Sequence, residues 1–389
     1  MEELPPKRES MKDLLEQINK SYNKGTLIPF VGAGFSTNIE GYPDWNGFIE
    51  LLEKEIQEEP GFLFENFKND NYEATEYVIH HFITSDEDEY DHHKIKNFSS
   101  AKHHLQVHIR DLFRCNQSDP KDWKLHIKLI NAKNIKQIYT TNWDRTLEET
   151  CISENRPCVR IVDIRDYKRY NDKNINNDKN INNGVLQIVK FHGDYDDPQS
   201  IVVCETDYFQ RMLELHPLDV KFRNDLMYNN FMFIGYGFRD PNIKYVMHQM
   251  NTLISKVEPE CRPKMYFVSI NKTDEARMQM LKTRKGFHIL YLLDLQDFNC
   301  SEPYPDGFIF KYEKVKENKQ HEFTLEHAFF YNDFLEWEEL KKTDYFEEID
   351  TEIKIKLELH YKDFHKKLVK EAFAQLFEQI FKEEKKEGA

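Results

Sequence analysis

Two glycines that directly follow a short apolar run give the first chemical signal in the sequence. Leu27 to Val31 is expected to be a buried strand, and Gly32-Ala33-Gly34 and Ser36 follow where a helix can begin. Gly32 and Gly34 let the backbone approach a pyrophosphate, and the next helix offers unpaired N–H groups and a positive dipole end. The motif is weak alone, and a tight turn without a ligand is the alternative.

Histidine spacing raises the question of a metal site. His104 and His108 have the i, i+4 spacing of a metal pair on one helix face, but no Glu directly follows His104. The six cysteines are scattered, and none forms a Cys-x-x-Cys pair, so neither a zinc ribbon nor a redox dithiol is indicated. We expect solvated polar faces here and no metal.

Short apolar runs alternate with helical patterns along the chain. Because these runs are apolar at nearly every position, they predict an α/β fold, a Rossmann-like parallel sheet with helices on both faces. The expected strands are Leu27–Val31, Ile135–Tyr139, Val159–Val162, Val185–Phe191, Asn230–Ile234, Lys264–Ile270 and His288–Leu292.

Polar clusters follow five of these strands. In a parallel sheet, ligands bind beyond the carboxyl ends of the strands, so the topology is expected to bring these clusters together. Besides the glycine turn, the clusters are Thr140–Asp144, His192–Asp194, Gly235–Asn242 and Asn271. This convergence is the strongest purely physical argument for a binding site.

Composition limits the classes of function. The 389-residue chain has 39% hydrophobic and 32% charged residues, so it is long enough for a full core. The net charge of -15 argues against a dominant nucleic-acid surface. No apolar run approaches the roughly 20 residues that span a bilayer, and the N-terminus has no apolar signal core. We therefore expect a cytoplasmic protein that binds neither nucleic acid directly nor a membrane.

The remaining segments suggest two domains. We expect residues 1–299 to form the catalytic domain, with a helical insertion at about 62–132. Its tandem repeat, Asp172–Asn183, is predicted to lie in a flexible loop, 171–183. Residues 300–389 form a C-terminal extension with strand-like alternation at Ile353–Tyr361. An apolar helical stripe follows, which either packs on its own domain or serves assembly into a homo-oligomer.

Four motifs in order resemble the sirtuin (SIR2) family. They are Gly32-Ala33-Gly34-Phe35-Ser36, Gly41-Tyr42-Pro43-Asp44-Trp45, Thr141-Asn142-Trp143-Asp144 and Phe191-His192-Gly193. Gly235-Tyr236-Gly237 with Asp240, and Ser269-Ile270-Asn271, look like the later NAD-contacting turns of that family. The resemblance covers roughly residues 25–295 and implies the SIR2 fold with NAD as substrate.

Two departures indicate a branch of the family. The sequence lacks the two Cys-x-x-Cys pairs of protein deacylases, and Asn46 stands where their motif has Arg. It is instead similar to bacterial SIR2-like proteins of antiphage defence, which degrade NAD to ADP-ribose and nicotinamide. The architecture looks most like the SIR2 subunit that pairs with a HerA-type ATPase.

The resemblance also assigns residue roles. It implies that Asn142 holds the water or the ribose face, that His192 is the base, and that Asp44 orients nicotinamide or water. Contacts to NAD are expected from Gly32, Ala33, Gly34, Ser36, Thr141, Gly235, Gly237, Asp240 and Asn271.

Each role has a structural alternative. Asn142 can cap a helix, His192 can be a satisfied strand-end histidine, and Arg239 with Asp240 can form a surface pair. Asp144 is read as a structural brace of the Asn142 turn. At the level of function, an NAD-dependent protein deacylase or ADP-ribosyltransferase and a non-catalytic NAD or ADP-ribose sensor stay open.

Overall fold

The computed structural model describes residues 10–68, 70–84, 97–114, 119–168, 185–214, 216–269, 275–292, 366 and 369–383, with the backbone of 310–316 and 319–325. The chain divides into two compact units, residues 1–291 with 377–389, and residues 292–376. The predicted flexible loop 171–183, Asn271 and the alternating segment Ile353–Tyr361 lie outside the described residues.

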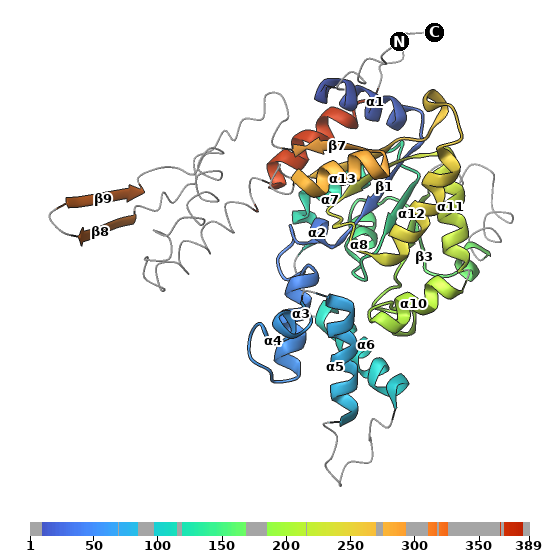
Figure 1. Ribbon diagram of the computed structural model, residues 1–389. Coiled ribbons are helices and arrows are strands. Elements are labelled where there is room, and N and C mark those ends of the chain that lie inside the picture. The colour runs from blue at the N-terminus through green and yellow to red at the C-terminus, as the bar shows by residue number, and fades with distance from the viewer. Residues whose placement is uncertain are drawn as a thin grey trace. The chain divides into compact units, whose positions relative to one another are not determined.

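A seven-stranded sheet lies at the centre of the first unit, in the order β3-β4-β2-β1-β5-β6-β7 (Figure 1). Every neighbouring pair is parallel. The strands are β1 Leu27–Val31, β2 Gln137–Thr140, β3 Cys158–Ile161, β4 Leu186–Lys190, β5 Asn230–Ile234, β6 Met265–Ser269 and β7 Phe287–Tyr291. The predicted α/β class with a parallel sheet is confirmed, and each of the seven expected strands is present.

The strand order changes direction at the centre of the sheet. From β1 the chain continues to β2 on one side, whereas from β5 it continues to β6 on the other. In open α/β sheets, ligands bind at such a switch point. Val31 pairs with Ile234, so the turns that begin at Gly32 and Gly235 leave the sheet at the same level.

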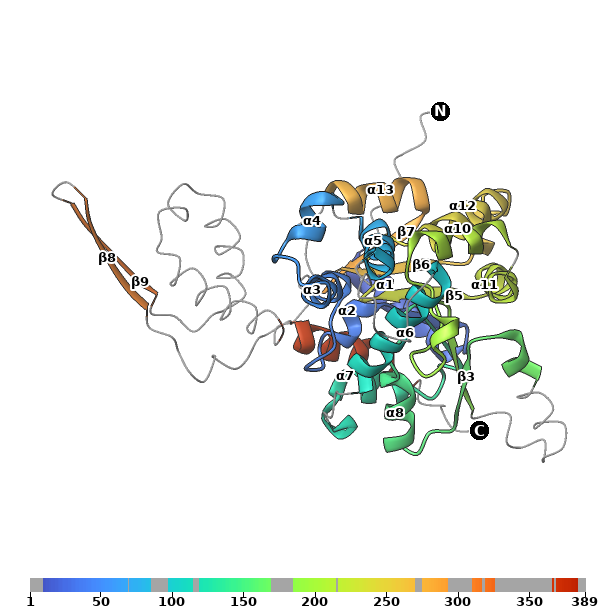
Figure 2. The same ribbon diagram turned by 90° about the horizontal axis from the view of Figure 1, so that it is seen from below.

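Helices cover both faces of this sheet. Figure 2 shows α10–α13 on one side and α7 and α8 on the other. The helices around the sheet are α1 Met11–Asn23, α2 Ala33–Ser36, α7 Lys124–Ile130, α8 Thr146–Ser153, α10 Glu205–Leu213, α11 Pro217–Tyr228, α12 Pro241–Ile254 and α13 Glu275–Lys285. Three short 3-10 turns are η1 Pro120–Asp122, η3 Pro198–Ser200 and η4 Pro259–Cys261.

Aromatic side chains fill the core between the sheet and α11 and α12. Phe30 of β1 is fully buried, with its ring centroid 5.0 Å from that of Phe233 and 5.7 Å from that of Phe222 on α11. The ring centroid of Tyr139 of β2 also lies 5.1 Å from that of Phe222, in a tilted arrangement. Burying each such ring contributes about 1.5–3 kcal/mol of transfer free energy, which fixes the central strands.

The helical insertion has a core of its own. Within the predicted bounds of about 62–132 lie α4 Phe62–Asn66, α5 Asn71–Thr84 and α6 Phe98–Arg114, and α3 Trp45–Glu55 precedes them and packs with them. They share a buried apolar cluster with Trp143, whose indole centroid lies 5.3 Å from the Phe48 ring. The group lies at one end of the sheet (Figure 1). Helix α7, in contrast, packs against α8. The insertion therefore sits on the loop that follows β2.

The last described residues return to the first unit. The Phe377 ring lies 6.2 Å from Phe35, and the Phe381 ring lies 5.1 Å from Tyr22 of α1. The amide of Asn19 donates to the carbonyl of Ile380 at 2.9 Å. This end of the apolar stripe thus packs on the first compact unit, with which residues 377–389 are grouped. In the second unit, β8 Phe310–Lys316 and β9 Lys319–Leu325 form an antiparallel pair.

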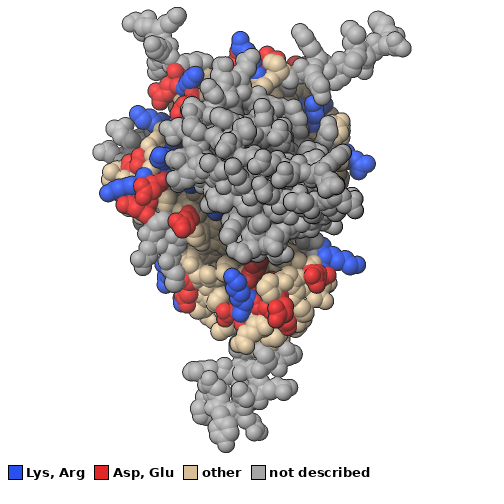
Figure 3. All heavy atoms as spheres, turned by 90° about the vertical axis from the view of Figure 1, so that its left-hand side faces the viewer, with Lys and Arg blue, Asp and Glu red and all other residues tan. Residues whose placement is uncertain are grey.

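The described surface carries both signs of charge. On the face seen in Figure 3, acidic and basic side chains are mixed over the described residues.

Within the described part of the chain, no helix is long and apolar enough to cross a membrane. The same residues contain no group of three or more His, Cys, Asp or Glu side chains placed to hold a metal ion.

Candidate active site

The turns after β1 and β5 are joined backbone to backbone. The amide of Gly32 donates to the carbonyl of Ile234 at 3.0 Å, and the amide of Gly34 donates to the carbonyl of Gly235 at 2.9 Å. A Cβ atom on Gly32 would lie 2.6 Å from the Gly235 oxygen, and one on Gly235 would lie 2.2 Å from the Phe35 nitrogen. Gly235 also has a φ of +58°. These three glycines are therefore required by the close approach of two turns.

The expected phosphate donors of this turn are engaged in the structure. Gly32 and Gly34 have their N–H groups in the bonds just described, and the Ser36 hydroxyl donates to Asp144 Oδ2 at 2.9 Å. Gly237 differs from them, because it is exposed and a Cβ there would meet nothing closer than Arg239 Cγ at 3.9 Å. Packing within the protein does not require glycine at this position.

Asn142 lies on the loop after β2, and its side chain contacts the glycine turn after β1. Its Nδ2 donates to the Gly32 carbonyl at 3.2 Å and to the Ser36 hydroxyl at 3.1 Å. The side chain is buried, and its Oδ1 has no hydrogen-bond partner. A buried acceptor without a partner costs about 1–3 kcal/mol, so it is a site where a ligand or water gains binding energy.

Asp144 braces the loop that carries Asn142. Its Oδ1 accepts from the Thr146 amide at 3.1 Å and from the Thr146 hydroxyl at 2.6 Å, while Oδ2 accepts from Ser36. The carboxylate is itself buried. These contacts agree with the structural role expected for Asp144. The helix cap considered for Asn142 is not formed by its side chain, because α8 has Arg145 at its N-cap position.

Beside Asn142 is a cavity of about 40 Å³, lined by Ala33, Pro43, Asp44, Trp45, Phe48, Phe113, Thr141, Asn142, Trp143 and Asp144. Asp44 is exposed at its rim and caps α3, because its Oδ1 accepts from the Gly47 amide at 2.9 Å. A cavity of this size holds a water, whereas sites for organic ligands typically measure about 300–1,000 Å³.

His192, at the end of β4, is buried between two polar side chains. Its Nε2 lies 3.0 Å from Asp240 Oδ2, and the Tyr208 hydroxyl lies 3.4 Å from Nδ1. The other oxygen of Asp240 accepts from the amides of Asn242 and Ile243 at 2.8 and 3.2 Å and so caps α12. Asp240 is thus neither in a surface pair with Arg239 nor exposed to solvent.

Two buried phenols complete the surroundings of His192. Burial raises the pKa of Tyr208, and the neighbouring Tyr72 hydroxyl acts in the same direction. Burial likewise raises the pKa of Tyr236, with the Asp240 carboxylate as a further cause. Both phenols therefore stay protonated at neutral pH, which makes them hydrogen-bond donors beside the Asp240 and His192 pair.

A fully buried lysine joins the two loops that carry Asn142 and His192. Lys190 Nζ donates to the Trp143 carbonyl at 3.0 Å and to the Asp144 carbonyl. It also lies 2.9 Å from Asp194 Oδ2 and 3.7 Å from Glu148 Oε1. Burial raises the pKa of Glu148, although Lys190 acts in the opposite direction. Lys190 thereby holds the backbone after Asn142 next to the segment that follows His192.

The structure thus gathers most of the predicted residues around two adjoining centres. The first contains the glycine turn, Ser36, Thr141 and Asn142 with Asp44 at its rim, and the second contains His192 with Asp240. Gly237 is exposed nearby, and Asn271 lies outside the described residues. Sequence reasoning missed Lys190 and Tyr208. Lys190 could have been noticed, because it is a lysine inside an apolar strand, directly before Phe191-His192. No sequence pattern marks Tyr208.

Comparison with known proteins places this geometry in a family context. Residues 136–289, which run from β2 into β7, match the model of a family described as a SIR2-like domain. The seven-stranded parallel sheet is consistent with the Rossmann-like SIR2 fold. Residues 136–289 are therefore similar to SIR2-like domains.

Distant relatives match a larger share of the chain. The chain is 24% identical to the NAD(+) hydrolase ThsA of Bacillus cereus (strain MSX-D12) over 74% of its own length and 54% of that protein. It is 22% identical to the defense-associated sirtuin 2 of Bacillus subtilis, over 74% of this chain and 25% of the relative. For the NAD(+) hydrolase ThsA of Acinetobacter baumannii (strain 532279), the identity is 22% over 61% and 42% of the two chains. The chain spans about half or less of these relatives.

Proposed function

We propose that this protein is an NAD+ hydrolase that cleaves the nicotinamide–ribose bond and so depletes NAD during antiphage defence in bacteria. The observation that carries the proposal is the position of Asn142 and His192 on adjoining loops at the carboxyl edge of a SIR2-like sheet. The names of the distant relatives, NAD(+) hydrolases and a defense-associated sirtuin, support the same activity.

The reaction consumes one water and yields nicotinamide, ADP-ribose and a proton. The bond between ribose C1′ and the pyridinium nitrogen breaks with its electron pair on nitrogen, so nicotinamide leaves as a neutral molecule. The ribose passes through an oxocarbenium-like state, as in glycoside hydrolysis. No strong general acid is needed, and the protein must supply positioning, a water and a proton acceptor.

Asn142 supplies the positioning in this proposal. Its Nδ2 is held by Gly32 and Ser36, which leaves the buried Oδ1 as the available acceptor. A water in the adjoining cavity, or a ribose hydroxyl after the cavity opens, would donate to this oxygen. The amide is oriented before substrate binds, which reduces the entropy lost in the reacting complex.

His192 is the proposed base. Asp240 Oδ2 lies 3.0 Å from Nε2 on one side of the ring, and the ring would accept the proton that the attacking water loses. The Tyr208 hydroxyl orients the other side of the ring. A base that is positioned by a neighbouring polar group, as His192 is here, recurs in hydrolytic sites.

The small volume of the cavity beside Asn142 supports a resting form with little activity. A volume of about 40 Å³ excludes nicotinamide, so turnover depends on displacement of α3 or α6, which provide part of the lining. We propose that the active assembly is a homo-oligomer in the cytoplasm that pairs with a HerA-type ATPase. Co-purification of that ATPase with this chain, and faster NAD turnover in the complex, test this finer assignment.

The test of the activity is NAD consumption with product analysis for wild type, Asn142→Ala and His192→Ala. The exposed His103 on α6 gives a matched control, His103→Ala. Equal release of nicotinamide and ADP-ribose, lost in the two site variants and retained in the control, is the expected result. NAD binding without turnover, alone and with the partner, would instead assign the chain as a sensor.

A further inference from the structure

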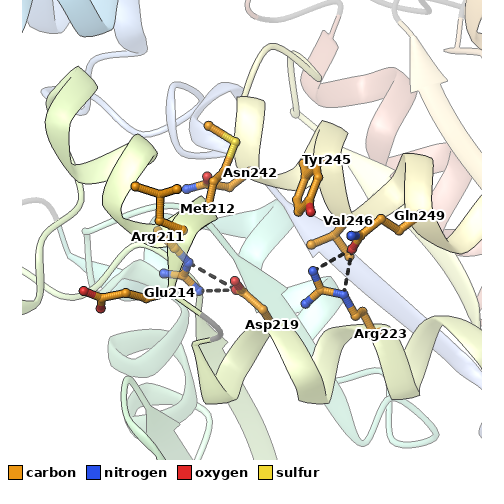
Figure 4. A pocket seen from close by; sticks show the side chains of 10 residues that line it. Arg211, Met212, Glu214, Asp219, Arg223, Asn242, Tyr245, Val246 and Gln249 are labelled. Carbon is orange, nitrogen blue, oxygen red and sulfur yellow. Dashed lines mark hydrogen bonds and ion pairs between the residues drawn. The ribbon is translucent and has the colours of Figure 1, made fainter.

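A second cavity lies away from the candidate active site, between α10, α11 and α12. Its volume is about 250 Å³, and its lining shares no residue with the cavity beside Asn142. Figure 4 shows side chains from the three helices around it. One wall reaches the catalytic segment, because the guanidinium of Arg211 donates to the Phe191 carbonyl.

Asn242 is the first unexplained group in this cavity. Its side chain is 2% exposed, and neither Nδ2 nor Oδ1 has a hydrogen-bond partner. Its backbone amide already satisfies the Asp240 cap, so the side chain has no part in starting α12. A buried amide with both groups unpaired is costly, and such groups in native proteins call for a water or a ligand.

The partners of the two arginines indicate the kind of ligand. Arg211 is neutralised by Asp219, whose Oδ1 lies 3.2 Å from Nε and 2.9 Å from Nη2. Arg223 donates from Nε and Nη2 to the neutral Gln249, at 3.1 and 2.8 Å, and its buried Nη1 has no partner. Glu214 points away from the centre of the cavity in Figure 4. The formal charges of Arg211, Arg223, Asp219 and Glu214 cancel across the lining, but the hydrogen bonds of Arg223 go to the neutral Gln249 and its Nη1 stays open.

The spacing along α12 sets the length of the ligand. Asn242, Val246 and Gln249 recur on one helix face, and seven residues of α-helix span about 10 Å. Arg223 is held at the Gln249 end and Asn242 lies at the other, with the half-exposed Tyr245 between them in Figure 4. This site suits an elongated molecule with an anionic end and a polar end.

The geometry points to a binding site for a small organic anion, with a carboxylate or phosphate on Arg223 Nη1 and a hydrogen-bonding group on the Asn242 amide. Charge-assisted bonds to a guanidinium are among the strongest that proteins form, and they recognise both kinds of oxyanion. Residues 211–249 provide this site independently of NAD turnover.

The test uses the full chain with inorganic phosphate and, separately, with acetate as probes, in thermal-shift and calorimetric titrations. The variants are Arg223→Gln, Asn242→Leu and a control, Lys256→Gln, which removes an exposed positive charge beyond the end of α12. We expect saturable binding of at least one probe by wild type and control. Arg223→Gln is expected to weaken it about tenfold or more.

Asn242→Leu separates a ligand site from a structural role. If Asn242 serves to bind a ligand, the Asn242→Leu protein without probe should melt at the same temperature as wild type or higher. Its response to the bound probe should be smaller than that of wild type. Saturating ADP-ribose is expected to leave the response unchanged. No saturable binding of either probe, an unaltered response in Arg223→Gln, or competition by ADP-ribose would overturn the site, whether or not the protein hydrolyses NAD.

Discussion

His192 Nε2 lies 3.0 Å from Asp240 Oδ2, while the second oxygen of the same carboxylate caps α12. A single side chain therefore caps a helix and lies within ion-pair distance of the proposed base. The two roles are separable, because asparagine caps helices about as well as aspartate but carries no charge.

Asp240→Asn is accordingly expected to lower kcat for NAD hydrolysis by about tenfold or more, with KM and the melting temperature little changed. Asp240→Ala removes both roles and should also destabilise the protein by about 1 kcal/mol. Steady-state kinetics and urea unfolding measure the two effects. Equal kcat in wild type and Asp240→Asn would leave Asp240 as a helix cap.

Two glycines of one turn are expected to respond in opposite ways. At Gly235 a Cβ would lie 2.2 Å from the Phe35 nitrogen at a φ of +58°, so Gly235→Ala should cost more than about 3 kcal/mol or prevent folding. At Gly237 the space is open, and Gly237→Ala should fold normally. If Gly237 contacts NAD as predicted, calorimetry will show weaker NAD binding in this variant. Unaltered affinity would remove Gly237 from the site.

His126 is expected to make the free energy of unfolding fall as the pH decreases. The ring is fully buried beside Phe35, and burial lowers its pKa to about 4 from the ordinary 6.5. Because the folded pKa is depressed, this contribution to stability is complete above pH 6.5 and is lost as the pH falls from there to about 4. The loss amounts to about 3 kcal/mol. Urea unfolding from pH 7 to 4 should show it, and His126→Phe should reduce that slope.

Lys190 is expected to matter for both folding and turnover. Lys190→Met leaves Glu148 and Asp194 buried with less compensation, at a cost of about 3–5 kcal/mol. Adding Glu148→Gln removes one of these charges and should restore part of the stability. The carbonyls of Trp143 and Asp144 still lack their donor in the double variant, so its kcat is expected to stay low. Full recovery of kcat would restrict Lys190 to a structural role.

Local sequence patterns were sufficient for the sheet, because each strand is a short apolar run with turn residues at its end. Helix α11 was missed, although Pro217 at its first turn and buried Leu218, Phe222 and Leu226 at four-residue spacing mark it. Through Phe222, this helix contributes to the aromatic core that covers Phe30 and Tyr139.

The site was predicted only as far as residue types reveal it. Motifs identified Asn142 and His192, whose roles stay predictions. The motifs did not indicate which atoms of these side chains already make hydrogen bonds within the protein. The contacts of Ser36 with Asp144 and of Asp240 with His192 join residues 108 and 48 positions apart. Such pairings depend on tertiary packing, so neither periodicity nor a local motif could indicate them.

The backbone bonds between the turns after β1 and β5 have a mechanical consequence. Backbone hydrogen bonds join Gly32 and Gly34 to Ile234 and Gly235. We therefore expect the two turns at the switch point to move together and not to separate. Any widening for a dinucleotide is then expected where α3 and α6 line the small cavity. If the proposed function is right, a crosslink between the sheet and α3 or α6 is expected to reduce NAD turnover.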